Sequence, residues 1–333
     1  MENISDKVSI VIPVYNGGKY LEGTLNSIMA QTHSQWEAIL VDDSSTDDSY
    51  AILQQFAAMD SRFKVYQKPN QRFACYGIRY GVEHSTGDWF CYMSQDDRLS
   101  PDFLEKTLAA AAMTGADISL GKMVVYNAEG ETEFRMPVAE GDVICGLQAF
   151  ELSLDWRIHG FYIIKMNLMR SVGISTGLLN DDEYDTRRHF LFAAKVTFCG
   201  GVFYYHDGNP DAITKKWTPA QLDYVKVGHK LRHFAREQAI ENTGNIDRLL
   251  RGVSGDACIR AAMMVFGAYR QGTASRQEIR QVMDTISESR TDWQGSSTAL
   301  KIGMTVRPVF GHRIALASII LAVKLQAKIR KIR

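Results

Sequence analysis

The feature that most constrains the fold of this chain is a regular alternation of strand-like and helix-like patterns over residues 8–113. Val8–Val14 (VSIVIPV) is an almost continuous apolar run rich in β-branched residues, which is typical of a strand buried on both faces. Strands and helices are predicted in turn at Val8–Val14, Tyr20–Gln31, Trp36–Val41, Ser49–Met59, Phe63–Gln67, Phe73–His84, Asp88–Met93 and Asp102–Met113. This alternation predicts an α/β fold in which a Rossmann-like, mostly parallel sheet is flanked by helices.

Three polar clusters begin where predicted strands end, at Pro13–Gly18, Asp42–Asp48 and Ser94–Asp97. In sheets of this kind, ligands bind beyond the carboxyl ends of the strands. Each cluster also has a purely structural explanation, because Asp and Ser cap helix N-termini, and we favour capping for Asp47 and Asp48. Two acidic pairs at one edge of a sheet would nevertheless repel each other unless a cation or a polar ligand met them. The combination therefore predicts a binding site.

Several common motifs are missing from the sequence. No GxGxxG fingerprint follows the first predicted strand and no GxxxxGK[ST] loop occurs, which argues against dinucleotide-binding oxidoreductases and P-loop NTPases. The five cysteines form no CxxC pair and the N-terminus does not resemble a signal peptide, so we expect a cytoplasmic protein with reduced thiols. No basic stripe is interleaved with aromatic residues, so nucleic acid is not expected as a partner.

The segment VSIVIPVYNGGKYLEGTLNSIMAQTHSQWEAILVDDSSTDDS closely resembles the N-terminal signature of family-two glycosyltransferases, the large inverting group with the GT-A fold. The resemblance continues through YGVEHSTGDWFCYMSQDDRLSPDFLEK and, more weakly, through LLNDDEYDTRRHF and FYYHDGNPDAITKKW, so it covers residues 8–217. It implies a GT-A fold and an enzyme that moves a sugar from a nucleotide-sugar donor onto an acceptor hydroxyl.

The resemblance assigns a nucleotide-lining role to three residues that follow the first predicted strand, Pro13, Tyr15 and Asn16. It places Tyr15 against the base, and it matches Asp43 to the carboxylate that accepts a hydrogen bond from the uracil imide N–H. A uridine donor is therefore implied. The family's basic Ala-Arg-Asn segment is altered here to Gly77-Ile78-Arg79, and Arg72 or Arg79 is expected to reach the donor phosphates.

By the same resemblance, Asp96 and Asp97 match the metal-binding acidic motif, and Asp97 is the first choice for the direct ligand. Ser94 replaces the first acid of that motif and Gln95 fills its spacer position, so the donor diphosphate would have to supply several metal ligands. His206 stands where some GT-A enzymes place a further metal or phosphate contact, and a histidine bonded to the backbone is an equal alternative. Oxygen ligands indicate a hard cation, Mn²⁺ or Mg²⁺.

Asp182 is predicted to be the catalytic base, because Asp181-Asp182 occupies the place of the family's Glu-Asp pair, whose second member is the base. Asp181 and Glu183 are rivals one residue away. The same acids begin a predicted helix, where Asn180 or Asp181 would act as the cap and the helix dipole would stabilise the anions. Four residues precede this cluster and could line an acceptor cleft or belong to the core: Trp156, His159, Tyr162 and Lys165.

Residues 1–215 are predicted to form the GT-A catalytic domain, with the nucleotide-sugar half at 1–114 and the acceptor half at 115–215. Residues 216–333 are predicted to form a helical extension, and residues 218–333 carry no usable resemblance. Its helices and one break are expected at His229–Gln238, Ala257–Tyr269, Arg276–Ser289, Gly303–Gly311 (the break) and 313–333.

The end of the chain is strongly basic, since residues 293–333 contain eight Lys or Arg and no acid. Residues 313–333 combine six of these cations with an apolar face of Ile, Leu, Ala and Val. Such a basic amphipathic helix is predicted to make peripheral contact with an anionic membrane, at the inner face of the cell membrane. The alternative is a helix that packs on the body of the protein or on a neighbouring subunit.

Together these features predict a metal-dependent inverting glycosyltransferase, of the hexosyl- or N-acetylhexosaminyl-transferase class. The expected donor is a UDP-sugar and the expected acceptor is a glycan or a lipid-linked glycan, in the synthesis of a surface polysaccharide. A nucleotidyltransferase is the first alternative, since it also uses a strand-end acidic pair and a metal. A non-catalytic nucleotide-sugar-binding protein is the second, supported by the lost acid at Ser94.

Overall fold

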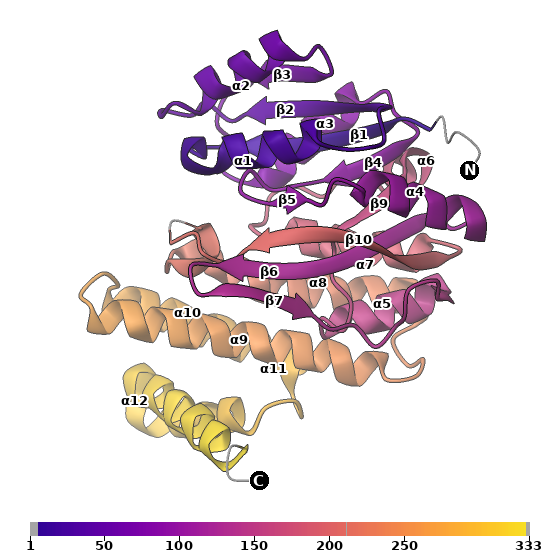
Figure 1. The fold of residues 1–333 in the computed structure, drawn as a ribbon. Coiled ribbons are helices and arrows are strands. Elements are labelled where there is room, and N and C mark those ends of the chain that lie inside the picture. The colour runs from indigo at the N-terminus through magenta and orange to yellow at the C-terminus, as the bar shows by residue number, and fades with distance from the viewer. Residues whose placement is uncertain (1–5, 211, 331–333) are drawn as a thin grey trace. The chain divides into compact units, whose positions relative to one another are not determined.

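The computed structural model describes residues 6–210 and 212–330. These residues form two compact units, coloured from indigo to salmon and from orange to yellow (Figure 1). The first unit runs to Gly177 and resumes over Asp181–Asn209, whereas the second takes in Leu178–Asn180 and continues from Pro210. Each unit has a hydrophobic core of its own.

Within the described residues, the first unit is built on a ten-stranded sheet with the order β3-β2-β1-β4-β9-β6-β10-β5, in which β7 adds to β6 and β8 adds to β10. The strands are β1 (Val8–Val14), β2 (Trp36–Asp42), β3 (Phe63–Gln67), β4 (Trp89–Tyr92), β5 (Arg98–Leu99), β6 (Ile118–Asn127), β7 (Gly130–Phe134), β8 (Val143–Ile144), β9 (Tyr162–Lys165) and β10 (Val196–His206). The strands β1 to β4 are parallel, as predicted. The rest of the sheet is mixed, because β9, β5, β7 and β8 run antiparallel to their neighbours.

Helices cover both faces of this sheet: α1 (Gly18–Met29), α2 (Ser49–Met59), α3 (Ala74–His84), α4 (Phe103–Thr114), α5 (Gly146–Leu154), α6 (Met166–Val172) and α7 (Asp181–Phe192). Successive strand residues point to opposite faces, so β1 contributes to two cores. Ile10 and Ile12 pack with side chains of α1, α2 and α4, whereas Val11 packs with side chains of α3, α5, α6 and α7. Every element predicted for residues 8–113 is present, with ends that differ by up to two residues.

Helix α3 lies unusually close to β1 because two of its residues are glycines. A Cβ atom on Gly77 would lie 2.7 Å from the Cβ of Pro13, and one on Gly81 would overlap the side chain of Val11. Small residues at these positions therefore let the helix backbone approach the strand that leads into the first polar cluster.

The second unit is helical, as predicted, and consists mainly of α8 (Asp223–Glu237), α9 (Ile246–Arg270), α10 (Arg276–Glu288), α11 (Arg290–Trp293) and α12 (Thr298–Arg330). The break predicted at Gly303–Gly311 is confined to Gly311, where φ is 77° and ψ is 177°. Gly303 lies in regular helix instead. A Cβ there would overlap Ile319, so Gly303 lets the two arms of α12 pack closely on either side of the kink.

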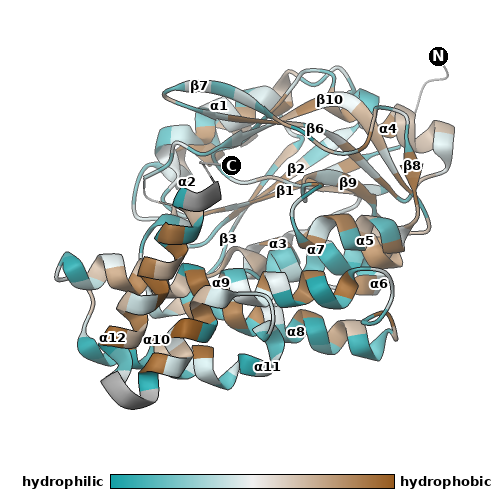
Figure 2. Cartoon of the chain, turned by 90° about the horizontal axis from the view of Figure 1, so that it is seen from below, coloured by the Kyte–Doolittle hydropathy of each residue, from teal (hydrophilic) through white to brown (hydrophobic). Residues whose placement is uncertain are grey.

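The coloured parts of helix α12 carry both hydrophobic and hydrophilic residues, as the alternating brown and teal segments show (Figure 2). No helix in the described part of the chain is both long enough and apolar enough to cross a membrane. Residues 331–333 of the predicted basic helix 313–333 lie outside the described residues.

Candidate functional site

The sheet brings the polar clusters of the sequence to one edge. Val14 at the end of β1 is paired with Asp42 at the end of β2, and β4 runs parallel to both. Strand β9 lies between β4 and β6 and is antiparallel to both, so β6 points the same way as β4. Strand β10 is parallel to β6 and therefore points the same way as well. Asp43, Asp96 and His206 therefore all lie at the carboxyl edge, where ligands bind in such sheets.

The loop after β1 is held by Gln95, the residue in the spacer position of the acidic motif. Its side-chain amide accepts a hydrogen bond from the Tyr15 N–H at 2.9 Å and donates one to the Tyr15 carbonyl at 3.1 Å. A Cβ on Gly17 would overlap this amide, so Gly17 is required for the close approach. Tyr15 is 49% exposed, so a planar ligand can reach its side chain.

Asn16 joins the first polar cluster to the second. Its backbone adopts a left-handed conformation with φ of 48°, which asparagine tolerates better than most residues. The Asn16 N–H donates to the Ser45 hydroxyl at 3.0 Å, and the Asn16 side-chain oxygen accepts from the Thr46 N–H at 2.8 Å. The loops after β1 and β2 therefore form one hydrogen-bonded rim.

Asp43 already has partners in this structure. The Lys68 ammonium pairs with its Oδ1, and the Gln71 N–H donates to both carboxylate oxygens at 3.2 Å. The side chains of Asp43 and Lys68 are largely buried, at 13% and 7% exposed. A carboxylate has about four lone-pair sites, so Oδ2 retains the capacity to accept one more donor.

The two arginines expected to reach the phosphates are both exposed. Arg72 lies just after the Asp43 partner Gln71 and has φ of 77°, a strained conformation that tends to occur at functional sites. Arg79 lies on α3 and donates to the Thr176 hydroxyl at 3.3 Å. Neither the backbone conformation of Arg72 nor the hydrogen bond of Arg79 assigns a phosphate-binding role to these arginines.

The two adjacent acids of the third cluster have different environments. Asp97 is fully buried, and its Oδ1 accepts from the His206 N–H at 2.9 Å. Burial, together with the neighbouring charge of Asp96, raises the pKa of Asp97 well above its ordinary value. Asp96 is partly exposed instead, at 15%, and its Oδ2 accepts from the Asn209 amide at 3.0 Å. Asp96 is therefore the acid that a ligand at this edge can reach.

The imidazole of His206 faces Asp96. Its Nδ1 lies 3.9 Å from Asp96 Oδ2, and its ring stacks on Tyr126 at 4.8 Å and contacts Tyr20 at 4.9 Å. Among the described residues this Nδ1 has no hydrogen-bond partner, which leaves one nitrogen available beside the carboxylate. The alternative role for His206 was a side chain that is hydrogen-bonded to the backbone. Its Nδ1 makes no such bond among the described residues.

A cation held here would have few protein ligands. No group of three or more His, Cys, Asp or Glu side chains that could hold a metal occurs in the described residues. The Asp96 carboxylate nevertheless fits Mn²⁺ or Mg²⁺, because such hard cations commonly bind through one or two carboxylates plus substrate phosphates, whereas an imidazole such as that of His206 is a ligand that Mg²⁺ disfavours. The donor set fits a metal that is completed by a diphosphate.

The second polar centre is a small cavity beside the first turn of α7. It has a volume of about 70 Å³ and is lined by Tyr92, Ser153, Trp156, Ile158, His159, Gly160, Phe161, Asp182, Glu183, Thr186 and Arg187. Desolvation by burial, followed by the charge of Glu183, raises the pKa of Asp182 to about 7. Asp182 therefore takes and releases a proton near neutral pH, in a cavity with aromatic walls.

The rival acids of α7 are less suited to proton transfer. Asp181 is 1% exposed and does not line the cavity. Glu183 lines the cavity, but its carboxylate lies 3.4 Å from the guanidinium of Arg187, which also donates to the Glu183 carbonyl at 2.8 Å. Arg187 is buried and was not singled out from the sequence, although its spacing of four residues from Glu183 on a helix is a recognisable pairing signal.

Of the four residues that could line an acceptor cleft or belong to the core, two line the Asp182 cavity and two make structural contacts. Trp156 and His159 line the cavity. Tyr162 is buried and hydrogen-bonds the His189 ring at 2.8 Å, and Lys165 pairs with Asp117 at 2.9 Å. Trp156 is 44% exposed and adopts φ of 57°, which is rare for a bulky residue.

Comparison with known proteins gives consistent matches. The family model described as glycosyl transferase family 2 matches residues 9–174. Glycosyltransferase GlyG of Streptococcus pneumoniae is 29% identical over 224 residues, covering 64% of this chain and 74% of GlyG. The putative teichuronic acid biosynthesis glycosyltransferase TuaG of Bacillus subtilis is 36% identical over 108 residues, covering 32% of this chain and 43% of TuaG.

Among solved structures, the chain is similar in fold to residues 1–349 of S. aureus TarS in complex with UDP-GlcNAc. The TM-score is 0.68 at 17% sequence identity, and the match covers 94% of this chain and 89% of that chain. The similarity therefore extends beyond the sheet to most of the chain.

Proposed function

Because the chain belongs to glycosyltransferase family 2 and has the GT-A fold, we propose that it transfers a sugar from a UDP-sugar to a hydroxyl of a glycan or a lipid-linked glycan, with inversion and with the help of Mn²⁺ or Mg²⁺. The observation that carries this proposal is the position of Tyr92 at the end of β4. Tyr92 lines the Asp182 cavity and hydrogen-bonds the Ser94 hydroxyl at 3.1 Å, two residues before Asp96. This supports a proposed proton acceptor that lies next to the proposed phosphate-binding edge.

The donor nucleoside is assigned to the rim formed by the first two loops. Tyr15 offers an exposed ring for the base, and Asp43 Oδ2 accepts the uracil imide N–H. The ion pair with Lys68 orients the Asp43 carboxylate, so that Oδ2 is left to accept from the base. The TarS structures in complex with UDP-GlcNAc and with UDP support a uridine donor, since the fold is the same.

The cation is assigned to Asp96 and His206, and Asp97 takes a supporting role in place of the direct ligation first expected. Asp97 fixes the end of β10 by accepting from the His206 N–H, so it positions the imidazole opposite Asp96. When bound, Mn²⁺ or Mg²⁺ stabilises the negative charge that develops on the departing diphosphate.

Asp182 is assigned as the base of the transfer. The acceptor hydroxyl gives its proton to the Asp182 carboxylate while its oxygen bonds to the anomeric carbon. The bond from that carbon to the diphosphate breaks, and UDP leaves with the electron pair. A single displacement of this kind inverts the anomeric configuration. Trp156 lines the cavity and is 44% exposed, so its aromatic face suits an acceptor sugar that lies outside the cavity, whose volume of about 70 Å³ is too small to enclose a sugar ring.

The donor assignment can be tested by calorimetry with UDP, GDP, dTDP and CMP, each with and without Mn²⁺. We expect UDP to bind most tightly and only with the metal, and Asp43→Asn to weaken UDP binding about tenfold or more, because a hydrogen bond to a charged group contributes about 1.5–3 kcal/mol. Asp48→Asn is the matched control, since Asp48 is exposed on the same loop. Tighter binding of another nucleotide, or equal loss in both variants, would contradict the role of Asp43.

We also propose that α12 contacts an anionic membrane, where a lipid-linked acceptor would be found. Three exposed apolar side chains share one face of α12: Ile314, Leu321 and Leu325 are 50%, 60% and 53% exposed. The opposite face packs into the helical core through residues such as Leu316 and Ile319. Exposed Arg313, Lys324 and Lys328 flank the apolar stripe, which is the pattern of a helix that lies in a membrane interface.

This contact can be measured by co-sedimentation with vesicles. We expect binding to vesicles that contain phosphatidylglycerol and not to pure phosphatidylcholine vesicles. The double substitution Leu321→Asn and Leu325→Asn should weaken binding more than tenfold, because burying one leucine contributes roughly 1.5–3 kcal/mol. Met59→Asn with Met113→Asn is the control, since both methionines are exposed in the first unit. Equal sedimentation of the two double variants would exclude the proposed surface.

A further inference from the structure

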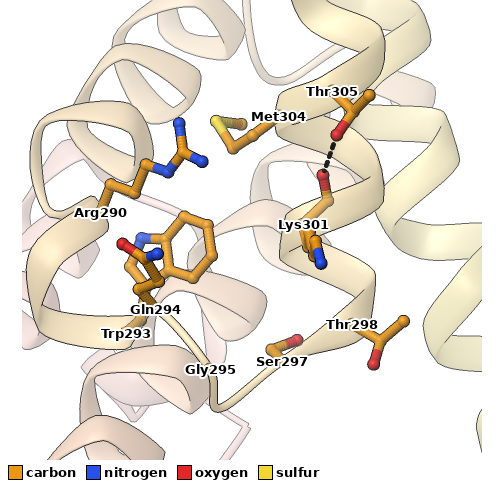
Figure 3. A pocket seen from close by; sticks show the side chains of 9 residues that line it. All are labelled: Arg290, Trp293, Gln294, Gly295, Ser297, Thr298, Lys301, Met304 and Thr305. Atoms are coloured by element: carbon orange, nitrogen blue, oxygen red, sulfur yellow. Dashed lines mark hydrogen bonds between the residues drawn. The ribbon is translucent and has the colours of Figure 1, made fainter.

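The helical unit contains a cavity that the proposed transfer reaction does not use. It lies between α11 and the first turns of α12, has a volume of about 390 Å³, and is lined by Arg290, Trp293, Gln294, Gly295, Ser297, Thr298, Lys301, Met304 and Thr305 (Figure 3). Pockets that hold small ligands usually measure about 300–1,000 Å³. The cavity is therefore large enough for a sugar-sized molecule.

The charge of this cavity is uniformly positive. Arg290 on α11 and Lys301 on α12 reach it from two sides, and none of its lining residues is acidic (Figure 3). Asp292, which lies between Arg290 and Trp293 along the chain, is engaged elsewhere, since it pairs with His229 at 2.9 Å and with Arg232 at 3.6 Å. Two cations that line one hollow without a carboxylate attract an anion.

The rest of the lining suits the uncharged part of a sugar. Gln294, Ser297 and Thr298 supply amide and hydroxyl groups, and the Thr305 hydroxyl, which donates to the Lys301 carbonyl at 2.9 Å, can still accept. Trp293 and Met304 form an apolar wall, and the indole N–H of Trp293 is fixed by a hydrogen bond to the Ile286 carbonyl at 2.9 Å. A bare inorganic ion would leave this wall and most of the volume unused.

We propose that this cavity binds an anionic saccharide, a sugar that carries a phosphate or a carboxylate, at a site in the helical unit that is distinct from the donor and acceptor sites of the GT-A unit. Arg290 and Lys301 hold the anionic group, and the hydroxyl and amide side chains hold the ring. The cavity is a binding site without a reaction of its own. Its presence does not depend on the transfer reaction proposed above.

The test uses the full chain without added metal and three probes of similar size: glucose 1-phosphate, glucuronate and glucose. Binding is followed by tryptophan fluorescence, and Trp293→Phe assigns the signal to the cavity. We expect a saturable change with at least one of the two anions and none with glucose. Arg290→Gln combined with Lys301→Gln should raise the dissociation constant about tenfold or more, because hydrogen bonds to charged groups are lost.

A matched control removes the same charge from exposed positions of α9 and α10, through Arg248→Gln combined with Arg280→Gln. This control should keep the dissociation constant within about twofold, since exposed charges outside the cavity contribute little. Binding of only one anion identifies the group recognised, phosphate or carboxylate. Equal binding of glucose, no saturable change with either anion, or equal weakening in both double variants would overturn the proposal. UDP binding by the GT-A unit is measured separately and does not enter this result.

Discussion

Asp182→Asn is expected to lower the turnover number of sugar transfer by about 10²–10⁴-fold, the usual contribution of a general base. The amide has nearly the same shape as the carboxylate but cannot take the acceptor proton. UDP affinity should stay unchanged, because Asp182 lines the aromatic cavity and not the nucleoside rim. The measurement is the steady-state release of UDP in the presence of acceptor, compared with calorimetric UDP binding by the same variant.

The pH dependence provides a second reading of the same residue. The base works only when ionised, and burial raises the pKa of Asp182 to about 7. Transfer by the native protein should therefore fall tenfold per pH unit below about pH 7, with a plateau above it. The residual activity of Asp182→Asn should not show this fall below about pH 7. Asp181→Asn is the control. If Asp181→Asn loses all activity while Asp182→Asn stays active, the base is Asp181 and not Asp182.

The largest effect on metal and donor binding is expected at Asp96 and not at its neighbour. Asp96→Asn should abolish the Mn²⁺-dependent part of UDP binding while leaving the fold intact, because Asp96 is partly exposed. A metal-bound carboxylate is a major source of the affinity of such sites for a hard cation. Calorimetric titration with UDP and Mn²⁺, together with thermal unfolding, gives both quantities.

Asp97→Asn is the matched comparison. The side chain of Asp97 is fully buried, and its raised pKa favours the neutral form that asparagine resembles. The amide oxygen can still accept from the His206 N–H, so metal-dependent UDP binding should persist, weakened less than in Asp96→Asn. If Asp97→Asn loses metal-dependent binding and Asp96→Asn retains it, Asp97 is the direct ligand after all.

The sequence predicts the donor half of the fold well, because its strands are long, apolar and separated by helices of ordinary length. The acceptor half is harder to predict for physical reasons. Strands β5 and β8 have two residues each, which is too short for any periodic pattern. The antiparallel insertion of β9 between β4 and β6 depends on long-range pairing, and no local signal reports it.

The site shows the same division between local and long-range information. Resemblance identifies the acidic motif, but the orientation of Asp96 and Asp97 depends on the turn after β4 and on the end of β10, more than 100 residues away. Lys68 was not anticipated, since it lies 25 residues from Asp43 and meets it only through the pairing of β2 with β3. Nor does the sequence reveal which aromatic residues of the middle region surround Asp182. Trp156 and Tyr162 are close on the chain, but Trp156 lines the Asp182 cavity whereas Tyr162 is bonded to the His189 ring.

The contact between Gln95 and Gly17 also limits how this family member can change over evolutionary time. Any larger residue at Gly17 overlaps the Gln95 amide, whereas a shorter residue at Gln95 leaves the backbone of Tyr15 without two hydrogen bonds. A larger residue at Gly17 therefore requires the flexible Gln95 side chain to move, and that movement breaks both hydrogen bonds to Tyr15. The residue in the spacer position of the acidic motif is therefore tied to a loop about 80 residues earlier in the chain. These two positions are expected to change as a pair among close relatives.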